Sequence, residues 1–444
     1  MLRLRDGQSV LWEALLPPQV KLLSPELAEI DALLDDDRLL APFVARFACP
    51  IGRPTVPIET YLRLMYLKHR YGLGYETLVK EVADSLSWRR FCRLALDREV
   101  PHPTTLLKLT RRFGPTVVEE LNEAVLKTAV ERKLLRSRRL RADTTVMEAD
   151  IRRPTDSGLC AHAITRLSRG VRRIRAFGLA SRTRFQDRSR SAGKIARRIS
   201  HSLGRAHGRA AIDRLTGEMH RLAKAALRQA SRVLGNARRG LRQKRRGAAA
   251  VVRLNLEVQR AERVIQQTAR RLLGERVIAD RLISLCDVDA RPIRRGRPQE
   301  PNEFGYKLSV ADTAEGFVVA HEVYLGNPAD ASTLQTMVAR AKAIGMKVRT
   351  VLADRGYGNE VGDQALAAEG IKHKVIPRVG KADPVEATSA WRRRYRFRAG
   401  CEGRISQLKR RGLRRARLKG YLGAEMWAGY GVLAHNLDRI VALQ

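Results

Sequence analysis

The sequence predicts a mixed α/β domain that is preceded by an all-helical module and interrupted by a basic helical insertion. Three observations predict it: a short strand-like segment at 140–147, a basic stretch with helical periodicity at 161–281, and alternating strand and helix patterns from 282 onward. Because the first strand must join the later sheet, the helical stretch is an insertion between the first and second strands. The predicted domains are the helical module 1–135, the first-strand region 136–160, the insertion 161–281, and the remaining α/β domain with C-terminal helices at 282–444.

The composition points to a polyanionic partner. The 444 residues include 86 Lys and Arg against 46 Asp and Glu, a formal net charge of +40. Nucleic acid is the leading partner, because phosphate neutralisation drives its binding. A membrane surface would require helices with large exposed apolar faces, and none stands out. Aromatic residues are 5% of the chain, so base stacking on aromatic platforms cannot dominate binding.

The five cysteines are scattered and odd in number, and no CxxC pair occurs among them. This pattern indicates neither a disulfide framework nor a zinc ribbon, and we expect a reducing, cytoplasmic compartment. Charged residues interrupt the apolar residues of the N-terminal segment, which therefore does not resemble a signal peptide. No uncharged run has the length of a membrane span.

The N-terminal module reads as short helices joined by tight turns. Ser24 before Pro25 is typical of a helix start, and Gly72 and Gly74 separate two helical segments. The expected helices include the segment of Leu62, Met65, Tyr66 and His69, then 75–86, 88–96 and 115–135. This arrangement fits a helix-turn-helix-like DNA-binding module, and a generic helical bundle fits it equally.

The insertion is the most basic part of the chain. Residues 161–250 contain 25 Lys or Arg against 3 Asp or Glu. Apolar residues recur there at three- and four-residue steps, which predicts helical hairpins with a basic outer face. A coiled-coil spacer with no specific ligand would show the same pattern.

The C-terminal segment predicts the remaining sheet. Strands are expected at 282–290, 304–312, 317–326, 347–353 and 372–379, and helices at 333–345 and 361–370. A loop with helix-capping residues at 326–332 precedes the first of these helices, and Gly345 ends that helix.

Two aspartates occur where such a sheet can bind ligands. Asp143 lies within the first strand, on the same face as Thr145 and Met147, and a charge in that position is costly unless it is paired or binds a metal. Asp354 follows a hydrophobic strand, and ligand sites in open α/β sheets gather at the carboxyl ends of strands. A simple loop cap would also explain Asp354.

A third acid lies in a charged helical segment. Tyr395, Arg398, Glu402 and Lys409 are spaced by three, four and seven residues, so one helix would place them on one broad face. A solvated amphipathic helix would have the same spacing. If Asp143, Asp354 and Glu402 converge, their chemistry is two-metal phosphoryl transfer, because hard cations bind carboxylate oxygens.

These motifs resemble those of bacterial insertion-sequence transposases of the DDE type, in the broad IS4/IS5-like group. Asp143 in LRADTTV, Asp354 in VLADRGYG and Glu402 in YRFRAGCEGRISQLK match the three acids of that family, and the last segment is similar to its Tyr-Arg-Glu-Lys signature. The resemblance covers about 50–120, 138–150 and 285–440. The insertion at 161–281 departs from the family in size, and no role transfers to it.

The resemblance implies a ribonuclease-H-like catalytic fold, two Mg²⁺ or Mn²⁺ ions bound by the three acids, cleavage at element ends and strand transfer into target DNA. It further implies that Tyr395, Arg398 and Lys409 hold DNA phosphates. Arg355 is a further phosphate candidate, although a structural ion pair would also explain it. Trp391 fits either a displaced base or the protein core.

The expected partners are double-stranded DNA, as element terminal repeats and target, and a second copy of the chain in a dimer or larger assembly. The expected location is the bacterial cytoplasm, in association with the nucleoid. Two other classes remain open: a DNA-binding protein without catalytic activity, such as a decayed element or an architectural factor, and a host nuclease that cuts DNA without joining it.

Overall fold

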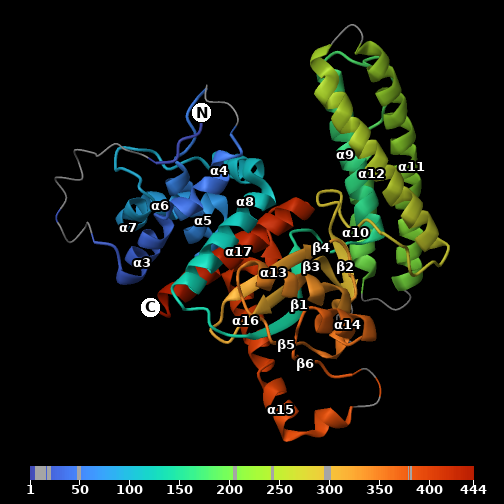
Figure 1. The fold of residues 1–444 in the computed structure, drawn as a ribbon. Helices are drawn as coiled ribbons and strands as arrows, with labels where there is room; N and C mark the ends of the chain where they lie inside the picture. Colours follow the sequence, from blue (N-terminus) through green and yellow to red (C-terminus); the bar gives the residue numbers. More distant parts are fainter. Residues whose placement is uncertain are drawn as a thin grey trace. The chain divides into compact units, whose positions relative to one another are not determined.

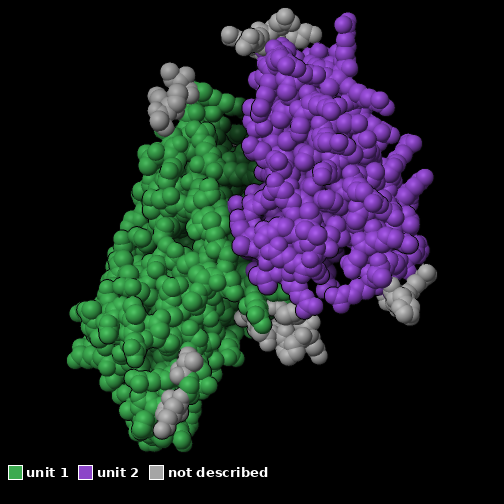
Figure 2. Space-filling view, turned by 90° about the vertical axis from the view of Figure 1, so that its right-hand side faces the viewer, with its two compact units in different colours: residues 1–150, 293–444 green, residues 151–292 purple. Residues whose placement is uncertain are grey.

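The chain divides into two compact units in the computed structural model. One unit comprises residues 1–150 and 293–444, and the other residues 151–292; Figure 2 colours them separately. The structure describes residues 1–5, 17, 22–47, 52–203, 208–241, 245–294, 302–378, 380 and 383–444. Among these, no helix combines the length and the apolar character needed to cross a membrane.

The N-terminal part of the first unit is helical, as predicted. Ser24 accepts a hydrogen bond from the Leu27 amide, which confirms the predicted helix start, and Gly72 (φ 65°) lies in the turn between α5 and α6. The predicted helix start at Pro115 is confirmed, because α8 begins at Pro103 but is broken by the non-helical Gly114 (φ 73°), after which its second part starts; this part ends at Glu131, before the predicted residue 135. The helices are α3 (Pro25–Leu34), α4 (Ala41–Val44), α5 (Ile58–Arg70), α6 (Tyr75–Asp84), α7 (Leu86–Phe91) and α8 (Pro103–Glu131).

These helices share a core with the C-terminal helix α17 (Tyr421–Val441), which lies beside α8 (Figure 1). The hydroxyls of Tyr61 and Tyr430 are 3.0 Å apart, and the Tyr66 hydroxyl donates to Asp438 at 2.6 Å. The N-terminal module is therefore built into the unit that carries the sheet. Its packing is common to a bundle and to a DNA-binding module, so its proposed contact with DNA stays a prediction.

The sheet of this unit is mixed. Its order is β2-β3-β1-β5-β6, with β4 paired to β3 and β7 paired to β1. β1 runs antiparallel to β3 and parallel to β5. The strands are β1 (Arg139–Ala149), β2 (Arg291–Arg294), β3 (Asn302–Asp312), β4 (Val318–Tyr324), β5 (Thr350–Leu352), β6 (His373–Val375) and β7 (Arg415–Ala416). The predicted mixed α/β sheet is thus present, and the first predicted strand pairs with the later ones.

The chain that follows β4 supplies further helices and turns of this unit (Figure 1). Gly345 (φ 91°) follows α13, as predicted. The segments are the 3-10 turn η3 (Asp330–Thr333), α13 (Leu334–Ala343), the turn η4 (Arg355–Tyr357), α14 (Glu360–Ala368), α15 (Ser389–Arg396), α16 (Ala399–Leu408) and the π-helical turn η6 (Lys409–Leu413).

The second unit is a bundle of α9 (Asp156–Ala176), α10 (Ser189–Ser202), α11 (Gly208–Gly240) and α12 (Ala248–Leu272). Small and aliphatic side chains of all four helices form its core, so the predicted helical character of the insertion is confirmed. The strand predicted at 282–290 is wrong. That segment has no strand, because Leu282 and Leu285 are buried in the core of the bundle instead.

Candidate active site

Strand register places Asp143 and Asp354 at the same level of the sheet. β1 and β5 are parallel neighbours in which Arg141 pairs with Leu352, and each aspartate lies two residues further along its chain. Parallel neighbours keep their register, so the two carboxyl groups meet at the carboxyl end of β5. The sequence therefore located two acids that the fold brings together.

Asp143 is a carboxylate with few charge partners. Its side chain is 16% exposed, and one oxygen accepts a hydrogen bond from the Thr144 amide at 2.8 Å. Its pKa is raised to about 6, mainly by burial; the charges of Asp354 and Asp330 act in the same direction, and the Thr144 amide and Arg398 act in the opposite one. Such a group gains from a nearby cation.

Asp354 begins the turn η4 and accepts a hydrogen bond from the Gly356 amide at 2.9 Å. The loop-cap interpretation is thus correct as far as it goes. Burial raises the pKa of Asp354, and the charge of Asp330 acts in the same direction. The cap fixes one carboxylate oxygen beside Asp143 without neutralising it.

Asp330 is an acid that the sequence analysis missed. Its carboxylate accepts from the Thr144 hydroxyl at 2.8 Å and pairs with Lys307 at 2.6 Å, and the other oxygen approaches Gly356. The expected capping role for this loop does not describe Asp330, because its side chain contacts β1 and β3. One sequence signal could have pointed to Asp330: it is an acid just before a helix that follows a β-hairpin. Ordinary helix caps show the same signal, so it does not single out a site residue.

The segment predicted as one helix consists of two helices and a π turn. Tyr395 lies in α15, Arg398 precedes α16, Glu402 lies within α16, and Lys409 begins η6. The single-helix expectation is therefore wrong, because the α-helix is interrupted at 397–398 and again after Leu408. The contacts of Arg398 still link neighbouring members of the set, since its guanidinium lies 5.8 Å from the centre of the Tyr395 ring.

Arg398 joins Glu402 to Asp143. One guanidinium nitrogen lies 3.7 Å from Asp143 and another 3.3 Å from Glu402, whose side chain is 68% exposed. Glu402 is thus connected to the aspartates through an arginine. Within the described part of the chain, no group of three or more His, Cys, Asp and Glu side chains is arranged to hold a metal ion.

A buried ionic cluster fixes α16 on the sheet. Arg141 donates to both oxygens of Asp312 (Nε to Oδ1 at 2.9 Å) and to the Phe397 carbonyl at 3.1 Å, and Arg404 pairs with Asp312 at 3.3 Å. Burial raises the pKa of Asp312, and the two arginines oppose this effect. A Cβ at Gly400 would lie 2.8 Å from Cζ of Arg141, so this glycine lets α16 approach the cluster.

The remaining predicted residues have different surroundings. Arg355 is exposed, and the described residues provide no ion-pair partner for it, so the structural ion pair considered for it is not found. Trp391 is half-buried and stacks on Tyr395 with ring centres 4.8 Å apart, so it is not a core residue. Lys409 is half-buried in η6.

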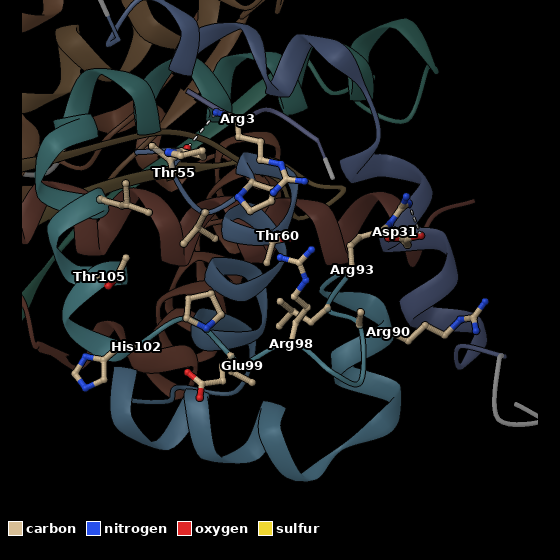
Figure 3. A pocket seen from close by; sticks show the side chains of 18 of the residues that line it. Arg3, Asp31, Thr55, Thr60, Arg90, Arg93, Arg98, Glu99, His102 and Thr105 are labelled. Carbon is tan, nitrogen blue, oxygen red and sulfur yellow. Dashed lines mark hydrogen bonds and ion pairs between the residues drawn. The ribbon is translucent and has the colours of Figure 1, made fainter. Parts of the chain in front are cut away.

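A cavity of about 1270 Å³ lies among the N-terminal helices (Figure 3). None of the three acids lines it. Arg93, on its wall, is paired with Asp31 at 3.1 Å. The other charged residues that line the cavity are Arg3, Arg53, Arg90, Arg98 and Glu99. The cavity is basic, and its lining does not include the carboxylates at the sheet.

Two segments of the chain match known protein families. Residues 12–112 match the model of a transposase domain (DUF772), and residues 280–437 match that of the transposase DDE domain. Asp354 and Glu402 lie within the second match, and Asp143 lies outside both. An uncharacterized protein, ORF8 in the nfe locus of Rhizobium meliloti, is 31% identical over 161 residues, which are 35% of this chain and 76% of that protein.

No solved structure matches the chain. The two domain models nevertheless cover more than half of its residues, on both sides of the inserted bundle. The chain therefore belongs to the family of transposases that carry a DDE domain.

Proposed function

We propose that this transposase cuts DNA at the ends of its element and joins the freed 3′ ends to target DNA, with Asp143, Asp354 and Glu402 as its catalytic acids. The observation that carries the proposal is that two partly buried aspartates lie at the same level of the sheet, Asp143 within β1 and Asp354 just beyond the end of its parallel neighbour β5. Both are held by backbone amides, which orient a carboxylate without removing its charge. Glu402 is linked to this pair through Arg398.

The donor set fits a hard divalent cation. Carboxylate oxygens are the ligands that Mg²⁺ and Mn²⁺ prefer. The pKa of Asp143 is raised mainly by burial and also by the neighbouring charges of Asp354 and Asp330, and a bound cation would offset both effects. We assign Asp143, Asp354 and Glu402 as the residues that would hold two such ions. A pair of cations stabilises the attacking and leaving oxygens of an in-line displacement at phosphorus.

Basic and phenolic side chains beside the acids would hold the DNA backbone. Arg398 uses two nitrogens on carboxylates at distances of 3.3 and 3.7 Å, and a guanidinium has five N–H donors. The remaining N–H donors of Arg398 can therefore bind a DNA phosphate. Tyr395, Lys409 and exposed Arg355 are assigned the same role, since arginine and lysine both bind phosphate oxygens.

Asp330 is assigned a supporting role in this chemistry. It ties Thr144, the neighbour of Asp143, to the turn that precedes α13, and it neutralises Lys307. We infer that Asp330 sets the position of the β1 backbone beside Asp143. Its effect on catalysis would then act through Asp143.

The assembly and location follow from the proposed reaction. Joining two element ends requires them to be held together, so we propose a dimer or larger assembly of this chain on terminal repeats and target DNA. The proposed substrate places the protein on the bacterial nucleoid. The N-terminal helices, whose cavity is lined by arginines, are proposed to contribute DNA contacts.

The decisive experiment compares Glu402→Gln with Glu360→Gln, a substitution of an exposed acid in α14. In Mg²⁺, Glu402→Gln should abolish nicking of supercoiled plasmid and cleavage of labelled element ends while DNA binding changes little. The Glu360 variant should cut normally. If Glu402→Gln still cuts DNA, its catalytic assignment is wrong.

A DNA-binding protein without catalytic activity is the second candidate, and the net charge of +40 favours it. It predicts binding without metal-dependent nicking by the unmodified protein. A host nuclease would nick but would not transfer labelled terminal inverted repeats into a target plasmid. The same two assays therefore separate the three classes.

A further inference from the structure

The inserted bundle carries most of the excess charge of the protein. Residues 151–292 contain 35 Lys and Arg against 10 Asp and Glu, an excess of 25 out of the total of 40. The bundle has its own apolar core, so its fold does not require this charge. Like charges at such density repel one another and destabilise the bundle unless an anion offsets them.

Three acids on and after α12 are consumed in ion pairs. Glu257 pairs with Arg166 at 2.5 Å, Asp280 with Arg291 at 2.7 Å, and Glu275 pairs with Arg270. The long helix α11 contains only two acids, Asp213 and Glu218. Its positive charge is therefore left largely unbalanced within the bundle.

The cations of α11 form one continuous line. Arg214, Arg221, Arg228 and Arg232 are separated by seven, seven and four residues, which on a helix of 3.6 residues per turn places them within about 40° of one another. All four are exposed, and the ion pairs of the described residues include none of them. We call these four residues the α11 arginine row. It is about 27 Å long at 1.5 Å per residue.

The opposite side of α11 is already occupied by protein. Leu215, Met219, Ala226 and Val233 are buried in the bundle core. A membrane-bound amphipathic helix would need that apolar face for lipid, so the arrangement disfavours a membrane surface. A rigid row of guanidinium groups instead suits the phosphates of a nucleic-acid backbone, to which arginine presents a planar fork.

We propose that the α11 arginine row binds the phosphate backbone of duplex DNA, which makes the inserted bundle a second DNA-binding surface of the transposase. Neighbouring α10 extends the surface, because Arg198 pairs with Glu218 of α11 at 3.2 Å and the exposed Lys194 and Arg197 lie on the same helix as Arg198. The row offers only side chains on a regular helix, so it binds DNA with little sequence preference. This inference rests on the proposed function for the identity of the polyanion.

The test measures how salt affects DNA binding by the full chain. Fluorescence anisotropy with a labelled duplex of about 40 base pairs is followed from about 50 to 200 mM NaCl, a range in which each phosphate contact adds about 0.9 to the slope of log K against log salt. Changing the four residues of the row to Gln should lower that slope by about 3 and weaken binding at least tenfold at about 150 mM salt. Changing them to Lys should keep the slope, because the charge is retained.

Two controls separate this effect from damage to the fold. Because the four substituted positions are exposed, the melting temperature and the circular dichroism of the Gln variant should equal those of the unmodified protein. Arg253→Gln, an exposed substitution on α12, should reduce the slope less than Arg221→Gln does. An equal effect of the two single variants would show that total charge matters and the row does not.

The outcomes also separate this inference from the proposed function. If the unmodified protein binds and cuts DNA while the Gln variant keeps the full salt slope, the α11 arginine row is not a DNA surface and the catalytic proposal stands. If the Gln variant loses binding to vesicles of anionic phospholipid and keeps its DNA binding, the row serves a membrane and the inference is overturned. If the unmodified protein does not bind DNA, both proposals are wrong.

Discussion

Two glycines of α16, on either side of Glu402, allow a matched test of how this helix is positioned. Gly400 faces the buried Arg141 side chain, whereas a Cβ at Gly403 would meet no atom within 4 Å. Both residues lie in the same helix: Gly400 precedes Glu402 by two residues, and Gly403 follows it directly. Gly400→Ala and Gly403→Ala therefore add the same methyl group with different consequences.

The expected magnitudes follow from what each methyl group meets. Alanine is favoured over glycine inside a helix by up to about 1 kcal/mol, so Gly403→Ala should be neutral or slightly stabilising. At Gly400 the same gain is opposed by displacement of Arg141, whose hydrogen bond to the Phe397 carbonyl is 3.1 Å long and partly buried. Losing a hydrogen bond to a charged group costs about 1.5–3 kcal/mol, which leaves a net loss of about 1–2 kcal/mol.

The assay combines thermal unfolding with cleavage of labelled element ends in Mg²⁺. Gly400→Ala should lower the melting temperature by roughly 2–4 °C and reduce cleavage, because α16 carries Glu402 and would shift away from β1. Gly403→Ala should melt at or above the unmodified temperature and cut normally. If both variants behave alike, the close approach of α16 to Arg141 does not position the site.

Two further predictions concern buried polar groups. Asp330→Asn should reduce cleavage more than DNA binding and lower the free energy of unfolding by about 1–3 kcal/mol, because it leaves the nearly buried Lys307 without its carboxylate. The double variant Asp330→Asn with Lys307→Met should recover stability. A fully active Asp330→Asn variant would exclude the supporting role of Asp330. Burial lowers the pKa of His435 from 6.5 to about 3, so the unfolded chain binds a proton below pH 6.5 that the folded chain does not. Stability therefore falls as pH falls, and at pH 5 His435 should account for about 2 kcal/mol of the loss. Urea unfolding at about pH 7 and 5 should show a smaller difference for His435→Gln, and identical pH dependences would refute the buried neutral imidazole.

The sequence was sufficient for the parts of the site that depend on local pattern. Asp143 could be found because a charge inside a strand-like segment is costly, and Asp354 because it follows an apolar run. Their mutual placement then required only that the two strands be parallel neighbours, which the register of Arg141 with Leu352 provides. The pairing itself, across more than 200 residues of chain, is not visible in either segment.

Other features depended on tertiary contacts and could not be predicted. The segment 282–290 has the composition of a strand, but Leu282 and Leu285 are buried in the core of the helical bundle. Asp330 has the sequence context of a helix cap, and only the approach of Thr144 and Lys307 gives it another partner. At the interruption at 397–398, the Phe397 carbonyl accepts a hydrogen bond from Arg141 of a distant strand, a contact that the local sequence does not reveal.

The way in which the acids are held distinguishes this site from the rest of the protein. With 86 cationic residues for 46 acids, most carboxylates can find a close arginine, as Asp31 does with Arg63 at 2.7 Å. Asp143 instead has a single guanidinium contact at 3.7 Å, and the ion pairs of the described residues include none for Asp354. Keeping two partly buried carboxylates under-neutralised costs stability in so basic a chain. A folded protein tolerates that cost where the charge is reserved for another cation, which is the physical reason to place the chemistry there.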